Sequence, residues 1–170
     1  MAVLPILVAP HPVLKQKAKP VEKVDARIAT LMDDMLETMY DADGIGLAAP
    51  QIGVLDRVIV VDVHGKNEPR NPLKMANPEV VWASDERVPC EEGCLSVPDQ
   101  YAEVMRPKAV RVRYLDQQNE IRELEADGML AVCIQHEIDH LNGVLFVDYL
   151  SMLKRNMILR KLQKQQRQNA

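Results

Sequence analysis

The stretch CIQHEIDHLNG, residues 133–143, contains two histidines four positions apart, with a glutamate directly after the first. Apolar residues precede it at helical spacing, and the Asn-Gly pair at its end is typical of a helix C-terminus. We therefore expect a helix that begins at about Asp127. On such a helix His136 and His140 lie one turn apart on one face, where both can bind the same metal ion.

The alternative for this stretch is a helix that carries two surface histidines, because a short pattern can occur by accident. Against it, the histidines share their face with Val132 and Cys133, which should point inward. Buried imidazoles need polar partners or a metal. The pattern therefore favours a metal site over two exposed side chains.

The rest of the chain predicts an α+β fold. Periodicity indicates a helix over residues 24–43, a glycine-held loop over 44–53, strands over 57–63 and 76–84, a hairpin of 109–115 with 121–126, and a C-terminal amphipathic helix. Strands and helices do not alternate regularly, which favours antiparallel sheets over a parallel doubly wound sheet. We expect these sheets to pack around the central histidine-bearing helix.

Length and composition indicate one globular unit. A chain of 170 residues buries a sizeable core without disulfides or a structural metal. No stretch reaches the roughly 18 apolar residues of a membrane span, and the apolar residues 1–10 lack a basic leader and contain two prolines. We expect a single domain over residues 1–170, located in the cytoplasm and not bound to a membrane.

Basic residues gather at the C-terminus. Residues 151–170 hold six basic and no acidic side chains, while the whole chain has a net charge of −4. A basic tail on an acidic body suggests a polyanionic partner, although a solvated basic helix is an equally good reading. The apolar side chains expected to anchor this helix are Leu150, Leu153, Met157, Ile158 and Leu162.

The third metal ligand must precede the helix. In the extended pattern of one class of zinc proteases a third histidine follows the second by six residues, and that position holds Phe146. No Glu, His or Cys follows His140, which also disfavours proteases that use a downstream glutamate.

Cysteines are the best upstream candidates. Cys133 lies on the histidine face, but it is seven residues from His140, about 10 Å along a helix axis, so we expect it in the pocket wall. Cys94 is the better ligand, because the neighbouring Gly93 lets the backbone pass close to a metal and its substrate. One thiolate with two imidazoles leaves a fourth position open, as in catalytic sites.

Three stretches resemble, in this order, the signature motifs of peptide deformylases: GIGLAAPQ (44–51), EGCLS (92–96) and QHEIDHLNG (135–143). The segment ILVAPHPVLKQKAKPV (6–21) is also similar to the family's opening, so the resemblance covers nearly the whole chain. It implies removal of the formyl group from the N-terminal formylmethionine of new polypeptides, with release of formate.

The resemblance also implies the roles of individual residues. The metal ligands would be Cys94, His136 and His140, and Glu137 would activate the metal-bound water and deliver its proton to the leaving amine. The oxyanion would be stabilised by the metal, Gln51 and the backbone N–H of Leu95. Contacts to the substrate would come from Ile45, Gly46, Gly93, Met129, Val132 and Cys133.

The implied cofactor is one divalent metal, Fe²⁺ in the cell, with Zn²⁺, Ni²⁺ or Co²⁺ as substitutes in purified protein. The implied partners are formylmethionyl nascent peptides and the ribosome, reached through the basic C-terminal helix, without sequence-specific nucleic-acid recognition. Tyr101 stands where many members carry arginine, and the role of Cys90 is open. The alternatives are a metallo-endopeptidase and a non-catalytic protein whose metal braces the fold.

Overall fold

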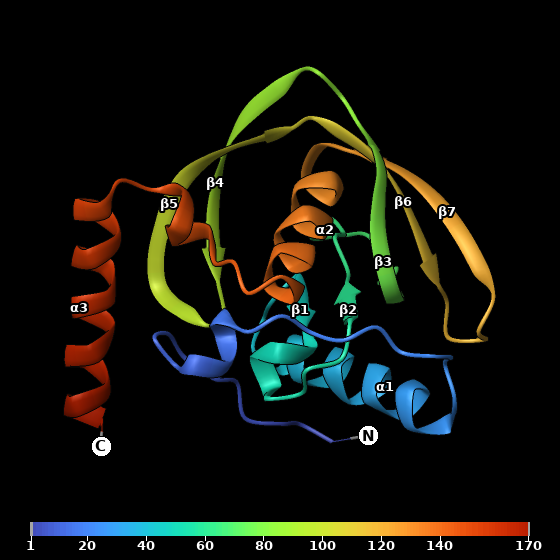
Figure 1. The fold of residues 1–170 in the computed structure, drawn as a ribbon, viewed down its shortest axis with the longest axis horizontal. Helices are drawn as coiled ribbons and strands as arrows, with labels where there is room; N and C mark the ends of the chain where they lie inside the picture. The colour runs from blue at the N-terminus through green and yellow to red at the C-terminus, as the bar shows by residue number, and fades with distance from the viewer. Residues whose placement is uncertain (1, 170) are drawn as a thin grey trace.

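The computed structural model describes residues 2–169 of the chain (Figure 1). Its regular elements, in chain order, are α1 (Ala26–Asp41), β1 (Gly46–Ala48), β2 (Val58–Val61), β3 (Leu73–Ala83), β4 (Arg87–Cys94), β5 (Val97–Pro107), β6 (Ala109–Leu115), β7 (Ile121–Asp127), α2 (Gly128–Leu141) and α3 (Met152–Asn169). Short 3-10 helices lie at η1 (Pro12–Lys15), η2 (Ala49–Ile52) and η3 (Phe146–Tyr149). Within the described part of the chain, no helix has both the length and the apolarity that a membrane crossing needs.

Two antiparallel sheets partly enclose helix α2. The larger has five strands in the order β1-β2-β3-β6-β7, and the smaller pairs β4 with β5. Figure 1 shows the long strands arching over α2, and this helix packs against β1, β2 and β7. The expected mixture of helices and antiparallel sheets is confirmed, as is the hairpin of β6 and β7.

Helix α1 follows the predicted periodicity closely. The Asp25 side chain accepts a hydrogen bond from the backbone N–H of Ile28 at 3.0 Å, which caps the free amides of the first turn. The buried face consists of Ile28, Met32, Met35, Thr38 and Met39. These methionines pack with Leu47, Val58 and Val60, so α1 supports the far side of β1 and β2.

Two segments differ from the sequence prediction. The segment expected to be a loop over residues 44–53 contains strand β1 and the 3-10 helix η2. Strands β4 and β5 were not predicted, because their inward positions include the charged Glu92 and Arg106, which conceal the alternation of apolar and polar residues.

Helix α3 is present, but its expected apolar face is partly wrong. Leu162 is buried and Ile158 is half-buried, whereas Leu153 is 72% and Met157 49% exposed. The buried side of the helix packs with Val97, Val104 and Phe146. Figure 1 shows α3 beside β5 at the periphery of the molecule, so only one narrow side of the helix meets the body.

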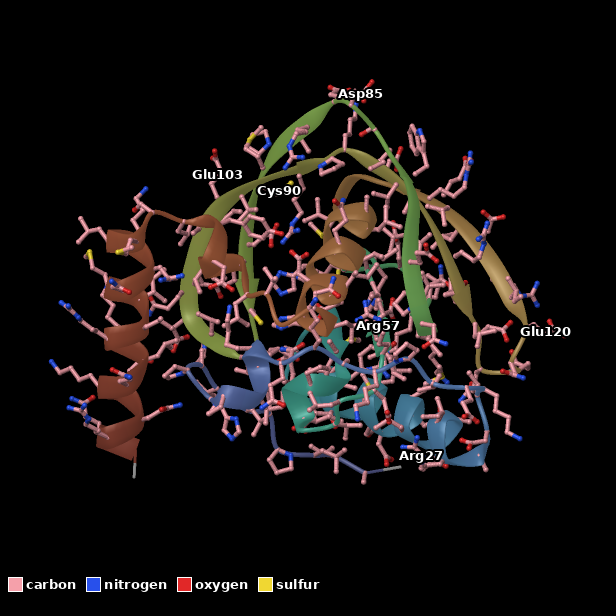
Figure 2. The ribbon with its side chains drawn as sticks, in the orientation of Figure 1. Arg27, Arg57, Asp85, Cys90, Glu103 and Glu120 are labelled. Atoms are coloured by element: carbon pink, nitrogen blue, oxygen red, sulfur yellow. The ribbon has the colours of Figure 1, made fainter. Side chains whose placement is uncertain are left out.

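The C-terminus of α2 is covered by the N-terminal segment. The amide of Ala18 donates to the carbonyl of Leu141 at 2.8 Å, and Arg57, labelled in Figure 2, donates to the same carbonyl at 3.1 Å. Gly143 follows with φ of 75°, and a Cβ at this position would lie 2.4 Å from the carbonyl oxygen of Lys15. The end of the histidine-bearing helix therefore requires a glycine for both its conformation and its close packing.

We expect Gly143→Ala to lower the free energy of unfolding by about 3 kcal/mol, because it combines left-handed strain with overpacking. Urea denaturation measures this loss. Gly128→Ala is the matched control, since Gly128 has φ of 59° with nothing within 4 Å of an added Cβ. That variant should lose only about 1 kcal/mol. Equal losses of unfolding free energy in the two variants would show that overpacking against Lys15 adds nothing to the cost of Gly143→Ala.

Candidate active site

Three side chains that could together hold a metal ion converge near the β4–β5 turn. The ligand atoms of Cys94, His136 and His140 all lie within 4.8 Å of one another. The Cys94 sulfur is 3.2 Å from Nε2 of His140, and the two histidine Nε2 atoms are also 3.2 Å apart. Two imidazole nitrogens and a thiol directed at one point are suited to a divalent transition metal, so these residues fit the metal that the motif implies.

Glu92 orients the first histidine. Its carboxylate accepts a hydrogen bond from Nδ1 of His136 at 2.9 Å, which leaves Nε2 of that ring directed at Cys94 and His140. Burial raises the pKa of Glu92, but hydrogen bonds from Arg106 and His136 outweigh this effect and lower the pKa below its ordinary value. Glu92 is therefore ionised at neutral pH and holds His136 in one tautomer.

Arg106 connects Glu92 to a second residue of α2, Asp139. Its guanidinium forms an ion pair with Glu92 and donates to Asp139 at 2.9 Å, and the Tyr149 hydroxyl donates to Asp139 at 2.8 Å. Arg106 and Glu92 are both buried. The sequence interpretation missed both residues. Glu92 opens the EGCLS stretch, but its partners Arg106 and His136 are 14 and 44 residues away along the chain, so no local pattern indicates the contact.

Glu137 lies in the same buried region, but it is not one of the three converging donors. Among the described residues, none forms a hydrogen bond with its Oε1 atom. Burial raises the pKa of Glu137 to about 7, although His136, when its ring is protonated, acts in the opposite direction. A carboxyl group with this pKa can both accept and return a proton near neutral pH.

Gln51 faces the metal-binding residues from η2. Its Nε2 donates to the hydroxyl of Ser96 at 3.0 Å and lies 3.5 Å from the Cys94 sulfur. Its Oε1 accepts from the amide of Ala48 at 2.9 Å, which fixes the orientation of the side chain. Leu95 forms the turn between β4 and β5, and Ser96, which the sequence interpretation did not single out, donates its backbone N–H to the Cys94 sulfur at 3.4 Å.

A cavity of about 570 Å³ opens beside these groups. Glu137, Gln51 and Leu95 line it, and so do the six residues that the motif resemblance assigned to the substrate: Ile45, Gly46, Gly93, Met129, Val132 and Cys133. Cys133 is buried, and its thiol lies 3.5 Å from the carbonyl oxygen of Ile45. Cys90, labelled in Figure 2, lies on β4 outside both the cavity and the donor cluster.

Strand β1 presents a free edge to this cavity. The amide of Asp62 donates to the carbonyl of Ile45 at 2.9 Å, and Gly46 is opposite Val61 in the antiparallel register. Because hydrogen-bonded and non-bonded pairs alternate, the N–H and C=O of Gly46 point away from β2. A Cβ on Gly46 would lie 2.4 Å from Oε2 of Glu137 and 2.8 Å from the Cys133 sulfur, so the strand can approach α2 only with glycine here.

Comparison with known proteins agrees with this geometry. The family model described as "Polypeptide deformylase" matches residues 3–156. The chain belongs to the peptide deformylase family. Members of this family are enzymes, and this chain is one of them. Its membership contradicts the alternative of a non-catalytic protein braced by a metal.

Individual relatives match over nearly their whole length. A peptide deformylase from Phenylobacterium zucineum is 59% identical over 164 residues, which cover 96% of this chain and 97% of the relative. The peptide deformylase of Rhizobium meliloti is 57% identical over 96% of this chain and 94% of its own length. The crystal structure of peptide deformylase from Ehrlichia chaffeensis superposes with a TM-score of 0.95 at 41% identity, over 99% of both chains.

We expect Glu92→Gln to weaken metal binding by about 10- to 100-fold, because His136 loses the carboxylate that orients it. Competition with a chromogenic chelator measures the dissociation constant. Asp139→Asn is the matched control, since it removes the other carboxylate beside Arg106 and leaves the Glu92–His136 bond in place. Equal weakening in both variants would assign the effect to the pairing of Arg106 rather than to His136.

Proposed function

We propose that this enzyme hydrolyses the N-formyl group of N-terminal formylmethionine on newly made polypeptides, as one catalytic domain spanning residues 1–170. The observation that carries the proposal is the buried side chain of Glu137, whose Oε1 has no hydrogen-bond partner among the described residues and which lines the same cavity as Cys94 and His136. The matched family supports the same reaction.

Cys94, His136 and His140 would hold one divalent metal, and we propose Fe²⁺ in the cell. When bound, the metal supplies a Lewis acid that polarises the formyl carbonyl and lowers the pKa of water. Glu137 takes a proton from the attacking water while the oxygen of that water forms a bond to the formyl carbon. The carbon–nitrogen bond then breaks, and Glu137 delivers the proton to the leaving nitrogen, which yields a free amine and formic acid. The acid loses its remaining proton to solvent and leaves as formate.

Gln51 and Leu95 act on the oxygen that gains negative charge. The Gln51 amide is already oriented by its bonds to Ala48 and Ser96. The backbone N–H of Leu95 lies in the turn directly after Cys94. Donors held where charge develops are each worth about 3 kcal/mol of transition-state stabilisation.

The substrate backbone pairs with the free N–H and C=O of Gly46 as an added strand. Ile45, whose carbonyl is bonded to Asp62, contributes its exposed side chain to the cavity. Val132 and Cys133, with the exposed Met129, form the apolar surface that receives the methionine side chain, and Gly93 also lines the cavity.

The proposed function predicts formate release from formyl-Met-Ala-Ser by iron-loaded protein handled without oxygen, and no cleavage of Met-Ala-Ser.

Glu137→Gln should retain one metal per chain by elemental analysis and lose about 10²- to 10⁴-fold in kcat. Glu103→Gln is the control, because this exposed carboxylate, labelled in Figure 2, lies outside the cavity. Internal cleavage of either peptide would favour the endopeptidase alternative, and metal loss in Glu137→Gln would contradict its proposed role.

We also propose that α3 docks on the ribosome. Five of its basic side chains are exposed: Lys154, Arg160, Lys161, Lys164 and Arg167. Arg155 is half-buried beside Asp148. Removing the whole helix would also remove the buried Leu162, so charge removal tests docking with less disturbance of the core.

Changing the five exposed basic residues of α3 to Gln should abolish co-sedimentation with ribosomes at moderate salt, because phosphate contacts dominate such binding. The control carries Gln at the exposed Lys17, Lys19, Lys23, Lys66 and Lys108. Retention of the α3 variant in the ribosome pellet at the level of the unmodified protein would contradict docking through this helix.

A further inference from the structure

Asp62 is a buried carboxylate that the proposed reaction does not use. It directly follows β2, and its side chain is fully buried. Its carboxylate accepts hydrogen bonds from the hydroxyl of Tyr40, from Nδ1 of His64 at 2.9 Å and from the backbone N–H of Asn71 at 3.1 Å. The described lining of the active-site cavity includes neither Asp62 nor these three partners. Asp62 therefore cannot act by contacting the substrate or the reacting atoms.

These partners keep Asp62 ionised. Burial raises the pKa of Asp62, but hydrogen bonds from Tyr40, His64 and the amide of Asn71 outweigh this effect and lower the pKa below its ordinary value. Burial and the bond to Asp62 raise the pKa of Tyr40 to about 12, so its hydroxyl retains the proton that it donates. Because a buried charge that loses one partner is left uncompensated, the carboxylate holds these groups in fixed relative positions.

The same residue also holds the start of β1 through its main chain. The N–H of Asp62 donates to the carbonyl of Ile45 at 2.9 Å, directly before the strand begins at Gly46. Strand β1 has only three residues, and its pairing with β2 ends at Val61. The bond to Ile45 therefore extends this pairing to the residue before β1, on the side opposite the edge along which we propose that the peptide binds.

Asp62 thus closes the connection between α1 and β1 at both ends. Tyr40, in the last turn of α1, is bonded to the side chain of Asp62, and Ile45 is bonded to its backbone. Residues 42–46, which end this connection and begin β1, all line the cavity. A movement of the connection would therefore change the shape of the cavity and displace the free edge at Gly46.

We propose that Asp62 is a positioning residue for the peptide substrate, because it closes the α1–β1 connection at both ends and holds the free edge of β1 where the peptide backbone binds. The inference rests on the proposed function, which places the substrate along this edge. The candidate metal ligands and Glu137 lie on other elements, β4 and α2. Loss of the Asp62 contacts should therefore weaken peptide binding equally in the ground state and the transition state, which raises KM and leaves kcat nearly unchanged.

The test measures KM and kcat for formyl-Met-Ala-Ser with the iron-loaded, full-length enzyme. Tyr40→Phe removes one hydroxyl and keeps the aromatic ring, whereas Asp62→Ala removes the whole carboxylate. We expect KM to rise about fivefold in Tyr40→Phe and about tenfold in Asp62→Ala, with kcat within about twofold of the unmodified enzyme. Combining the two changes should raise KM no further than Asp62→Ala alone, because Tyr40 acts through the carboxylate that this variant lacks.

Asp116→Ala is the matched control. The Asp116 carboxylate also accepts hydrogen bonds from three groups, which are the amides of Gln118 and Glu120 and the guanidinium of Arg122. It lies at the turn between β6 and β7, outside the cavity. This variant should lower the melting temperature and leave KM unchanged.

Hydrogen exchange of the Asp62 backbone amide tests the contact directly, because that amide is bonded to Ile45. Tyr40→Phe leaves residue 62 itself unchanged, so faster exchange in this variant would report greater freedom of the α1–β1 connection. Asp116→Ala should leave the exchange rate as it is in the unmodified enzyme. Unaltered exchange in Tyr40→Phe would contradict the proposed role of Asp62.

The outcomes separate this inference from the proposed function. If the folded Tyr40→Phe variant keeps the KM of the unmodified enzyme, or loses kcat with KM unchanged, the inference is overturned and the deformylase reaction stands. This variant decides alone if Asp62→Ala does not fold. An equal rise of KM in Asp116→Ala would assign the effect to general destabilisation and also overturn the inference. Failure of the unmodified enzyme to release formate overturns the proposed function, and the inference falls with it.

Discussion

The buried carboxylate of Glu92 is the group on which the arrangement of the site depends. It bonds to His136 on α2 and to Arg106 on β5, and Arg106 also bonds to Asp139 on α2. A buried charge is tolerated only when its partners are in place, and removing one partner leaves the other uncompensated. The small β4–β5 sheet and the histidine-bearing helix are therefore held in one relative position, which brings Cys94, two residues along β4 from Glu92, to His140 at 3.2 Å.

The opposite wall of the site depends on close packing rather than on charge. Gly46 lets strand β1 approach Glu137 and Cys133 more closely than any side chain would permit. The same strand is supported from behind by the methionines of α1. The buried Glu137, the candidate metal ligands and the edge of β1 thus lie around one cavity, and this combination suits the proposed hydrolysis of an extended peptide.

Elements whose inward face is apolar could be predicted from the sequence. The helical period of α1 and the alternation of β6 and β7 each follow from burial of one face against a hydrophobic core. Strands β4 and β5 could not be predicted in this way, because the residues they turn inward include Glu92 and Arg106. The exposed Leu153 and Met157 on α3 illustrate the converse, since apolar spacing alone does not say how much of a peripheral helix meets the body.

By itself, the sequence determined the helix that bears His136 and His140, because spacing along one helix is a local property. Residue types alone indicated Cys94 as a candidate third donor, because no Glu, His or Cys follows His140. Only the tertiary structure decided which groups support them. The contacts of Glu92 with His136 and Arg106, and the pairing that leaves one edge of β1 free at Gly46, join residues from separate strands and helices. Such contacts depend on how the sheets pack against the helix. No local pattern along the chain specifies the distance between a sheet and the helix.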